Sequence, residues 1–451
     1  MQLWRKFWQG AVGESKLKQY LFSSALSSLL LQIFSAFLTL ASALTISRIT
    51  ADEGFGIYST VFTWLTLGAM LALFGTDDLL TREIPTLHEK GDKTNIQQLI
   101  KWTTSIALIG AGFVISVFLF CLHILELPIF VQYKEAYYWG LLSLPCFVLL
   151  YNYQAALRAM RYAALGQLSE KIIQPSFFIL FLIGGYGIGF LFDDVHAVAF
   201  RSITLLIATI AAAYILRKQV NLLSTNTILP FPKPQKIKWL KSCLFFMLAS
   251  LLYAVNTRVD IAMLDIFQVE AAQIGHYNAA ARLSEILSMP FMLLGAIAAP
   301  VFAQLFKTDK AKLQQFYAQA TLMAFVLTLI GFGGLWLLGE WILGLFGKEY
   351  KGGYAILLLL SCAKLLHAFV GPVSYLLMMA DKEKAAMYSI IASVVFTLLA
   401  HNLWIPLYGV AGAAWATFVG LLFYEGLQIL LLWRYLRLYP TVLSYFIRIK
   451  K

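Results

Sequence analysis

The sequence predicts an all-α polytopic membrane protein with about twelve transmembrane helices, arranged as two parallel six-helix repeats around a central cleft. Three observations predict this fold. First, 60% of the residues are apolar and only 13% are charged, whereas soluble domains carry about 25% charged residues. Second, apolar runs long enough to cross a hydrocarbon core of about 30 Å recur along the whole chain. Third, the second half repeats short motifs of the first half.

The transmembrane segments are identified by length and hydropathy, because a helix needs roughly 20 largely apolar residues to span the bilayer. They are residues 20–46, 57–75, 102–122, 136–157, 163–190, 195–216, 239–264, 276–305, 316–338, 354–379, 386–406 and 409–433. Segment 57–75 is the shortest and is expected to be longer or tilted. Pro175 predicts a kink within 163–190. Residues 3–8 interleave aromatic and basic side chains, which predicts a short helix lying on the membrane surface.

The predicted spans divide the chain into five parts. They are an amphipathic amino-terminal segment (1–19), a first six-helix bundle (20–218), a basic linker (219–238), a second six-helix bundle (239–433) and a basic tail (434–451). Lys and Arg gather in the loops and tails on one side of this pattern, while the opposite loops carry more acids. The positive-inside rule therefore predicts that both termini are cytoplasmic.

The two halves share motifs in the same order, at an offset of about 220 residues. Asp92–Leu99 leads into the third span as D-K-x-x-apolar-Q-Q-apolar, and Asp309–Phe316 leads into the ninth span in the same way. Phe55–Tyr58 opens the second span, as Ile274–Tyr277 opens the eighth. Because six is even, both units cross the membrane in the same sense. Parallel repeats of this kind are typical of alternating-access transporters.

Composition and motifs exclude several functions. The net charge of +12 comes from cations in short clusters between apolar runs, which is a topology pattern and not a nucleic-acid-binding face. The four cysteines lie inside apolar runs without ligand spacing, and no metal cluster, phosphate loop or catalytic motif is present in the sequence. We therefore expect neither an enzyme nor a cofactor or nucleic-acid partner.

Charged residues inside the spans are the candidate functional residues, because burying a charge in the bilayer is costly. The acids are Glu170, Asp260, Glu285 and Glu425. With Arg48 at the outer end of the first span, the cations expected to line a path for an anionic ligand are Arg48, Lys171, Arg201, Arg258, Arg282 and Lys364. The last four of these fall at a similar depth below the outer face. Arg is suited to such a path because it binds phosphate oxygens bidentately.

A structural role is the alternative for each of these cations. Arg282 and Glu285 are three residues apart on one helix, so they can pair with each other. Lys171 lies near the inner end of its span and can snorkel to the interface. Arg201 and Lys364 have no acid nearby in the sequence, which makes them the stronger candidates for the path.

At this point the sequence resembles the polysaccharide, O-antigen-type flippases of the multidrug/oligosaccharidyl-lipid/polysaccharide (MOP) superfamily. The resemblance lies in Arg48–Tyr58 after the first span and in Asp260 followed by Ile274–Arg282. It continues in Pro290 with Ala298-Ala299-Pro300, and in G-V-A-G-A-A from Gly409. The motifs are individually loose, but their order, together with the length and the duplication, extends the likeness over essentially the whole chain.

The resemblance implies a function and a location. Members of the family move undecaprenyl-diphosphate-linked oligosaccharides from the inner to the outer leaflet of the bacterial plasma membrane, for polysaccharides such as the O-antigen of lipopolysaccharide. It implies the same substrate here, alternating access as the mechanism, and polysaccharide assembly enzymes as partners. Proton or sodium coupling would involve Asp260, Glu285 or Glu425, while His367 is expected to be a packing residue more than a proton relay. Sugar contacts would come from Tyr151, Asn152, Tyr153 and Asn256.

Three other functions compete with this one. A proton- or sodium-coupled multidrug or cation antiporter of the same superfamily would have a similar length, but its first helix often carries an acid, and 20–46 has none. A peptidoglycan-precursor flippase usually has two further helices. A polysaccharide polymerase or ligase would need a large outer loop with catalytic Arg or His, which 123–135 and 339–353 do not offer.

Overall fold

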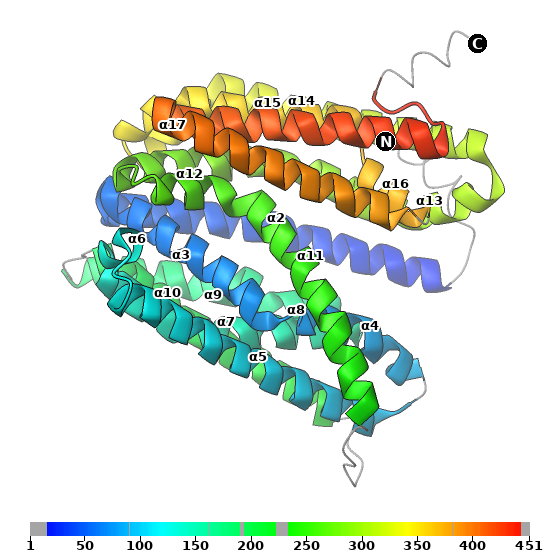
Figure 1. Ribbon diagram of the computed structural model, residues 1–451, viewed down its shortest axis with the longest axis horizontal. Coiled ribbons are helices and arrows are strands. Elements are labelled where there is room, and N and C mark those ends of the chain that lie inside the picture. Colours follow the sequence, from blue (N-terminus) through cyan, green and yellow to red (C-terminus); the bar gives the residue numbers. More distant parts are fainter. Residues whose placement is uncertain are drawn as a thin grey trace.

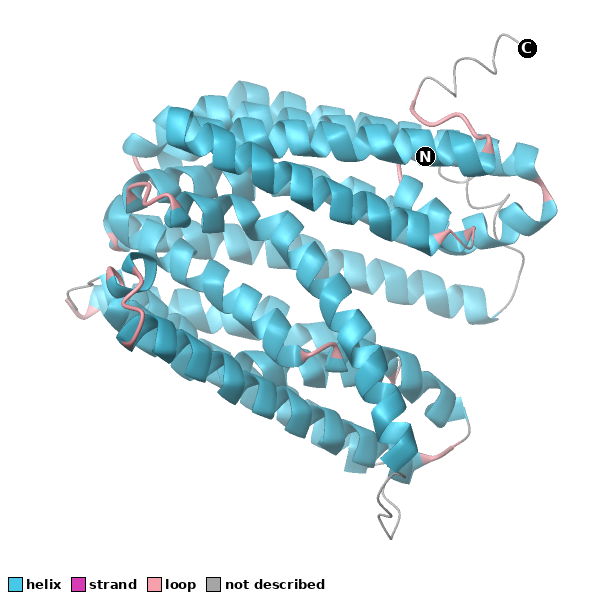
Figure 2. Ribbon diagram, in the orientation of Figure 1, coloured by secondary structure: helices cyan, strands magenta, loops and turns pink. Residues whose placement is uncertain are grey.

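The computed structural model describes residues 16–89, 91–160, 162–189, 194–221, 233–380 and 382–442. Within these ranges nearly every residue is helical and no strand occurs (Figure 2). The predicted all-α class is confirmed. Residues 3–8, expected to form a surface helix, lie outside the described residues, as do most of the linker and the end of the tail.

The first half of the chain forms one lobe (Figure 1). Its elements are α2 (Lys16–Ile49), α3 (Ala51–Leu73), α4 (Thr76–Glu89), α5 (Lys93–His123), α6 (Pro128–Val131), α7 (Lys134–Ala159), α8 (Ala163–Leu168), a π-helical turn (Ser169–Ile173), α9 (Gln174–Gly187) and α10 (Asp194–Asn221). We call the helices of the second half the second lobe, and the first of them crosses onto the helices of the first half (Figure 1). The elements of the second lobe are α11 (Lys233–Ile266), α12 (Ala271–Glu285), a 3-10 turn (Ile286–Ser288), α13 (Met289–Thr308), α14 (Lys310–Phe346), a 3-10 segment (Glu349–Gly353), α15 (Tyr354–Val370), α16 (Val373–Met379) and α17 (Glu383–Leu436).

Eight helical segments of the described residues are long and apolar enough to cross a membrane. One of them, α17, is two antiparallel legs joined at Gly409, whose φ of 56° interrupts the helix. The legs face each other, since Gln428 donates to the Ser389 hydroxyl over 2.8 Å and Phe396 stacks on Phe423. The chain is a multi-pass membrane protein, while the number of twelve crossings stays a prediction.

Proline and glycine set the breaks within the spans. Ahead of Pro175 the helix relaxes into the π-helical turn Ser169–Ile173, because proline cannot donate the next backbone hydrogen bond and displaces the preceding carbonyl. Pro175 therefore follows an irregular turn of the helix, at the place where the kink was predicted. Gly371 and Pro372 separate α15 from α16. The short segment 57–75 is longer at its amino-terminal end, since α3 begins at Ala51, and it ends at Leu73, where Phe74 and Gly75 separate it from α4.

The repeated D-K-x-x motif proves to be a repeated helix cap. The Asp92 carboxylate accepts from the Asn95 backbone N–H over 3.2 Å at the start of α5. The Asp309 carboxylate accepts from the Ala311 and Lys312 N–H groups over 2.9 and 3.0 Å at the start of α14. Each Asp thus satisfies N–H groups that the first helical turn leaves open. The sequence repeat is therefore a structural repeat.

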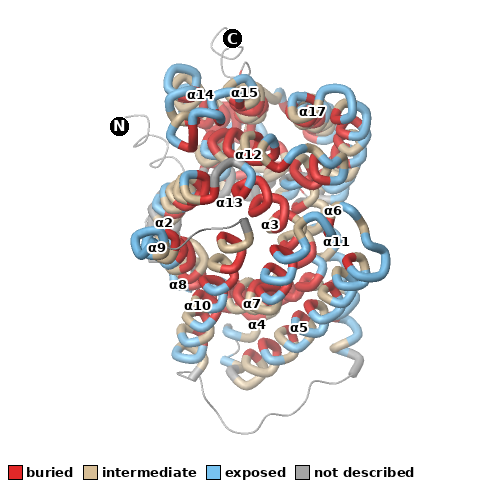
Figure 3. Tube along the Cα trace, turned by 90° about the vertical axis from the view of Figure 1, so that its left-hand side faces the viewer, coloured by how far each residue is buried: buried red, intermediate tan, exposed pale blue. Residues whose placement is uncertain are grey.

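The two lobes meet mainly through α3, which packs on α12 and α11. Figure 3 shows buried residues concentrated along these inner helices, while the outward faces of α5, α14 and α17 are exposed. Large apolar side chains cover those outward faces, for example Phe113 at 69% exposure and Leu337 at 74%. Such faces suit lipid and not water. We call the end of the bundle that contains Arg48 the outer end, following the predicted orientation.

Candidate functional site

Three arginines from different helices gather between the lobes. Arg201 is on α10 of the first lobe, while Arg258 on α11 and Arg282 on α12 belong to the second lobe. Arg201 and Arg258 are both close enough to act electrostatically on Arg282, and both act on the Tyr151 hydroxyl on α7. We call Arg201, Arg258 and Arg282 the arginine cluster. The cluster thus combines cations from both halves of the chain, while its role in a ligand path stays a prediction.

Arg201 is held by aromatic rings. Its guanidinium lies 5.8 Å from the ring centre of Phe62 on α3 and 5.6 Å from that of Phe178 on α9. Cation–π contacts of this kind stabilise a positive charge without neutralising it. The Arg201 Nε is buried and has no hydrogen-bond partner. A buried cationic donor left unpaired is costly, so this atom is suited to receive an anionic ligand.

Arg282 is held in a similar way on the other side. Its guanidinium lies 5.9 Å from the ring centre of Phe55 and close to the Tyr58 hydroxyl, both on α3. Its Nε donates to the Asn278 side-chain oxygen over 3.4 Å, a long contact. All of these partners are neutral. The Arg282 charge is therefore positioned at the lobe interface without being compensated there.

Carboxylates do not neutralise the cluster. Within the described parts of the chain, no carboxylate lies within 4 Å of a guanidinium nitrogen of Arg201, Arg258 or Arg282. Glu170 on the π-helical turn joins this network through the Tyr151 hydroxyl, from which it accepts over 3.2 Å. Glu170 also lies 3.8 Å from Lys171. Like charges in close proximity repel each other strongly away from bulk water, so the cluster favours occupation by an anion.

The predicted Arg282–Glu285 pair does not form. Glu285 instead pairs with Lys364 on α15, with 3.0 Å between Nζ and Oε2. Spacing along the sequence allowed the first pair, but the second needs the packing of α12 on α15. Lys364, which has no acid nearby in the sequence, therefore has one in the fold. It differs from the three arginines in this respect.

Two further polar networks lie inside the second lobe. The His367 Nδ1 hydrogen-bonds to the Glu425 carboxylate, and the ring centre of His367 lies 3.9 Å from that of Phe291. His367 therefore has a hydrogen-bond partner on α17 and packs on an aromatic ring, and its functional role stays a prediction. Asp260 accepts from the Tyr277 hydroxyl over 2.8 Å. The three acids expected to take part in coupling, Asp260, Glu285 and Glu425, thus each have a partner on another helix.

Arg48 lies at the outer end and ties the lobes together. Its Nε donates to the Leu345 carbonyl over 2.6 Å and its guanidinium NH2 nitrogen donates to the Gly344 carbonyl over 3.1 Å. These carbonyls belong to the last turn of α14, where a cation interacts favourably with the helix dipole. Ser47 beside it donates to the Phe346 carbonyl over 3.2 Å. Arg48 and Ser47 therefore connect α2 to the end of α14.

A second contact at the outer end was missed from the sequence. Trp64 on α3 donates through Nε1 to the Asp265 carboxylate on α11 over 2.7 Å, and Asp265 is only 4% exposed. Asp265 lies just beyond the predicted span 239–264. Its burial against the other lobe is a tertiary effect that no local pattern signals.

The expectation that Asn152 contacts a sugar is not supported by its position in the fold. Asn152 is fully buried inside the first lobe, where it hydrogen-bonds to the hydroxyls of Thr103 and Thr76. Tyr151, one residue earlier, points the other way and joins the network of the arginine cluster. The side chain of Asn256 lies outside the described residues.

Comparison with known proteins decides the family. A family model described as "Polysaccharide biosynthesis protein" matches residues 21–306, well over half of the chain. The chain belongs to the polysaccharide biosynthesis protein family. This confirms the resemblance stated above on the sequence motifs. No curated protein sequence matches the chain significantly.

Solved structures show that this member of the family has the fold of MOP-superfamily transporters. An inward-facing multidrug-resistance MATE transporter is 16% identical, covering 89% of this chain and 94% of its own, with a TM-score of 0.72. The lipid II flippase MurJ in an inward closed conformation is 14% identical over 93% of this chain and 89% of its own, with a TM-score of 0.71. A Pyrococcus furiosus MOP transporter, described as having a binding pocket of reverse polarity, reaches a TM-score of 0.65 at 15% identity, covering 93% and 95%.

Proposed function

We propose that this protein flips undecaprenyl-diphosphate-linked oligosaccharides from the inner to the outer leaflet of a bacterial plasma membrane. The observation that carries the proposal is the arginine cluster, in which Arg201 and Arg258 lie close enough to Arg282 to act on its charge, with no carboxylate within 4 Å among the described residues. A diphosphate that crosses the membrane needs positive charge along its route. A family that serves polysaccharide biosynthesis has such a substrate.

The chemistry of arginine supports a diphosphate as the ligand. Each guanidinium can make two parallel N–H···O bonds to phosphate oxygens, and these charge-assisted bonds are about twice as strong as neutral ones. The unpaired Nε of Arg201 offers a donor that is already buried. Arg48, Lys171 and Lys364 extend the path as weaker sites, since each already has a partner. A cavity for cationic drugs would instead be acidic, which disfavours the antiporter alternative.

Alternating access is the mechanism that the contacts favour. The lobes are tied at the outer end by Arg48, Ser47 and the Trp64–Asp265 hydrogen bond. A diphosphate-sugar would enter from the inner side, bind the cluster and neutralise it. Loss of that repulsion would let the lobes rock, break the outer contacts and release the head group outward. The isoprenoid chain would stay in the bilayer.

Coupling, sugar binding and partners complete the proposal. Protonation or sodium binding at Asp260, Glu285 or Glu425 would drive the cycle, and each acid already bridges two helices of the second lobe. Tyr151 would contact the first sugars beside the diphosphate. Both termini would lie in the cytoplasm, where polysaccharide assembly enzymes would deliver the substrate.

The test is leaflet exposure of a lipid-diphosphate oligosaccharide in proteoliposomes. Arg201→Gln, Arg258→Gln and Arg282→Gln are expected to slow translocation on the order of tenfold or more each, because a charged hydrogen bond contributes about 1.5–3 kcal/mol. Arg217→Gln, on the exposed inner end of α10, is the matched control and should behave as wild type. If wild type moves no lipid-linked sugar but exchanges cationic dyes for protons, the antiporter function replaces this one.

A further inference from the structure

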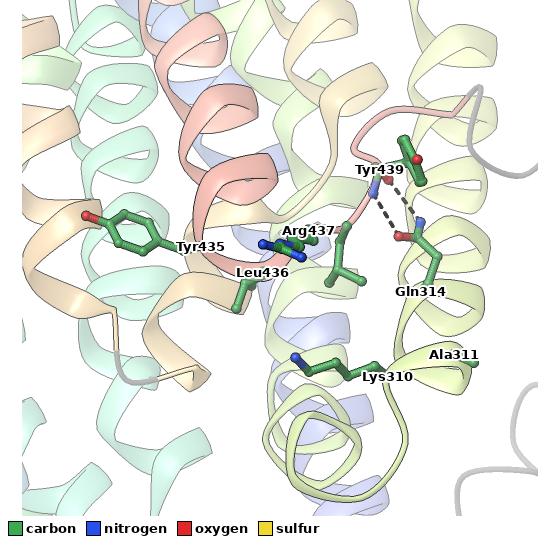
Figure 4. Close-up of a pocket in the computed structure, with 8 residues that line it drawn as sticks. Lys310, Ala311, Gln314, Tyr435, Leu436, Arg437 and Tyr439 are labelled. Atoms are coloured by element: carbon green, nitrogen blue, oxygen red, sulfur yellow. Dashed lines mark hydrogen bonds between the residues drawn. The ribbon is translucent and has the colours of Figure 1, made fainter.

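A second basic site lies far from the arginine cluster, at the inner end of the second lobe. The first turns of α14 and the segment that follows α17 enclose a groove of about 520 Å³. Figure 4 shows Lys310 and Ala311 at the start of α14, and Tyr435, Leu436, Arg437 and Tyr439 on the chain that ends and follows α17. The groove is lined by Lys310, Ala311, Gln314, Tyr435, Leu436, Arg437, Leu438 and Tyr439.

Lys310 and Arg437 bring two positive charges to this groove. In the described residues, no carboxylate lies within 4 Å of the nitrogens of either side chain. The adjacent acid, Asp309, is already committed, because it caps α14 through the Ala311 and Lys312 N–H groups and pairs with the Lys312 Nζ at 3.3 Å. The groove is therefore positive and has no internal counter-charge.

The wall of the groove is built before any ligand arrives. The Gln314 side chain donates to the Tyr439 carbonyl over 2.9 Å and accepts from the Tyr439 N–H over 2.8 Å, as the dashed lines in Figure 4 mark. This pair of bonds ties the chain after α17 to α14. Arg437 ends α17 in the left-handed region, with φ at 54°. A non-glycine residue is seldom found there, and here the turn directs the chain back across the groove.

The surroundings of the groove are those of a membrane interface. Trp433, Tyr435 and Tyr439 are 62%, 46% and 63% exposed, and exposed aromatic residues of this kind mark the level of the lipid head groups. Lys382 lies over the Tyr435 ring at 5.5 Å. Leu436 and Leu438 are buried beneath. A ligand here would meet cations at the head-group level and apolar surface toward the bilayer.

We propose that this groove binds the phosphate of an anionic phospholipid in the leaflet at the inner end. Lys310 and Arg437 would hold the phosphate from opposite walls, and Tyr435 and Tyr439 would contact the glycerol region. Each Lys or Arg near the membrane surface is attracted to anionic lipid head groups. The site would anchor the second lobe at the membrane surface while the lobes rock. It does not depend on the identity of the transported substrate.

The proposal is tested on purified protein by lipid-induced thermal stabilisation and native mass spectrometry. Phosphatidylglycerol is compared with phosphatidylcholine and with inorganic phosphate. Wild type is expected to bind phosphatidylglycerol preferentially. The double variant Lys310→Gln/Arg437→Gln should lose on the order of tenfold in affinity, with an unchanged melting temperature in phosphatidylcholine. Lys348→Gln/Arg217→Gln removes two exposed cations elsewhere and should bind as wild type.

Three results would overturn the proposal. An equal loss in both double variants would mean that phosphatidylglycerol responds only to net charge. Saturation by inorganic phosphate alone, at the same residues, would make the groove a site for free phosphate and not for lipid. If the double variant melts lower in phosphatidylcholine, Arg437→Gln and Lys310→Gln are measured singly. Unchanged lipid preference in a stable single variant of each residue would also refute the site.

Discussion

Ser59 and Asn278 hydrogen-bond to each other across the lobe interface, and they occupy equivalent positions of the two repeats. The Asn278 amide donates to the Ser59 hydroxyl, and the two residues are 219 positions apart, which is the offset between Phe55–Tyr58 and Ile274–Tyr277. When a residue touches its own repeat equivalent, the contact must lie close to the pseudo-two-fold axis that relates the repeats. The axis therefore passes between α3 and α12, beside Arg282.

Cross-linking this contact should trap the protein with its outer end closed. In a background without the four native cysteines, Ser59→Cys/Asn278→Cys is expected to form a disulfide that abolishes translocation, and a reducing agent should restore it. The control pair is Ser389→Cys/Gln428→Cys, which joins the legs of α17 within one lobe. Full transport by the oxidised Ser59→Cys/Asn278→Cys protein would show that the lobes do not separate at the axis.

The Trp64–Asp265 hydrogen bond should favour the closed outer end. Trp64→Phe removes the donor but keeps the ring, leaving the buried Asp265 carboxylate without this partner at a cost of about 1–3 kcal/mol. The population open to the outside should rise. A membrane-impermeant thiol reagent applied from outside should therefore label Ser59→Cys faster in the Trp64→Phe background. An unchanged labelling rate would show that the Trp64–Asp265 hydrogen bond does not hold the outer end closed.

Gly56 permits the close approach of α3 to α12. A Cβ at this position would lie 1.8 Å from the Ala271 carbonyl oxygen, so Gly56→Ala must push the helices apart. We expect more outward opening and slower transport, measured by the same labelling and by translocation. Gly184→Ala is the matched control, because nothing lies within 4 Å of its Cβ, and alanine favours a helix over glycine. If Gly56→Ala leaves both labelling and translocation unchanged, the close approach of α3 to α12 is not needed for the closed outer end.

Asp77 should make stability depend on pH. It lies at the start of α4, outside the spans, where burial and the neighbouring Asp78 raise its pKa from 3.8 to about 6, partly offset by Arg158. The Asp78 carboxylate accepts from the Ser250 hydroxyl on α11 over 3.1 Å. Cys243 lies near both aspartates and near Arg82. The folded protein thus holds a proton on Asp77 that the unfolded chain releases near pH 4.

The sign of the effect follows from linkage. With a raised carboxyl pKa, the native state binds the extra proton, so the contribution to stability is full below about pH 4 and is lost as the pH rises through about 6. The difference is at most about 3 kcal/mol, from about 1.4 kcal/mol for each unit of pKa. Thermal unfolding in detergent should show wild type gaining stability from pH 7 to pH 5 relative to Asp77→Asn. If the stabilities of wild type and Asp77→Asn change with pH in parallel, the raised pKa of Asp77 is refuted.

Much of the fold could be predicted because membrane helices obey simple rules. Hydropathy located the helices, and the motif repeat located equivalent positions such as Asp92 and Asp309, whose capping role is local. Within the candidate site, the convergence of Arg201, Arg258 and Arg282 followed from depth along the helices. These features depend on sequence distance, length and composition alone.

What the sequence did not predict depends on which helices pack together. Lys364 pairs with Glu285 on another helix, although Arg282 is nearer in sequence. Asp265 is buried by the opposite lobe, and Asn152 turns into its own lobe while Tyr151 turns out. A shift of one residue around a helix turns a side chain by about 100°. Polarity alone therefore could not assign these residues.

The most direct test of the central claim is the affinity of the purified protein for an isoprenyl-diphosphate oligosaccharide. We predict that the affinity weakens by about tenfold or more in Arg201→Gln and in Arg282→Gln and stays unchanged in Arg217→Gln. Because the cluster is partly shielded from solvent, rising salt should lower the affinity of the wild type less than it would weaken an exposed ion pair. Equal affinity in wild type and both cluster variants, with all proteins folded, would contradict the claim that the arginine cluster binds the diphosphate.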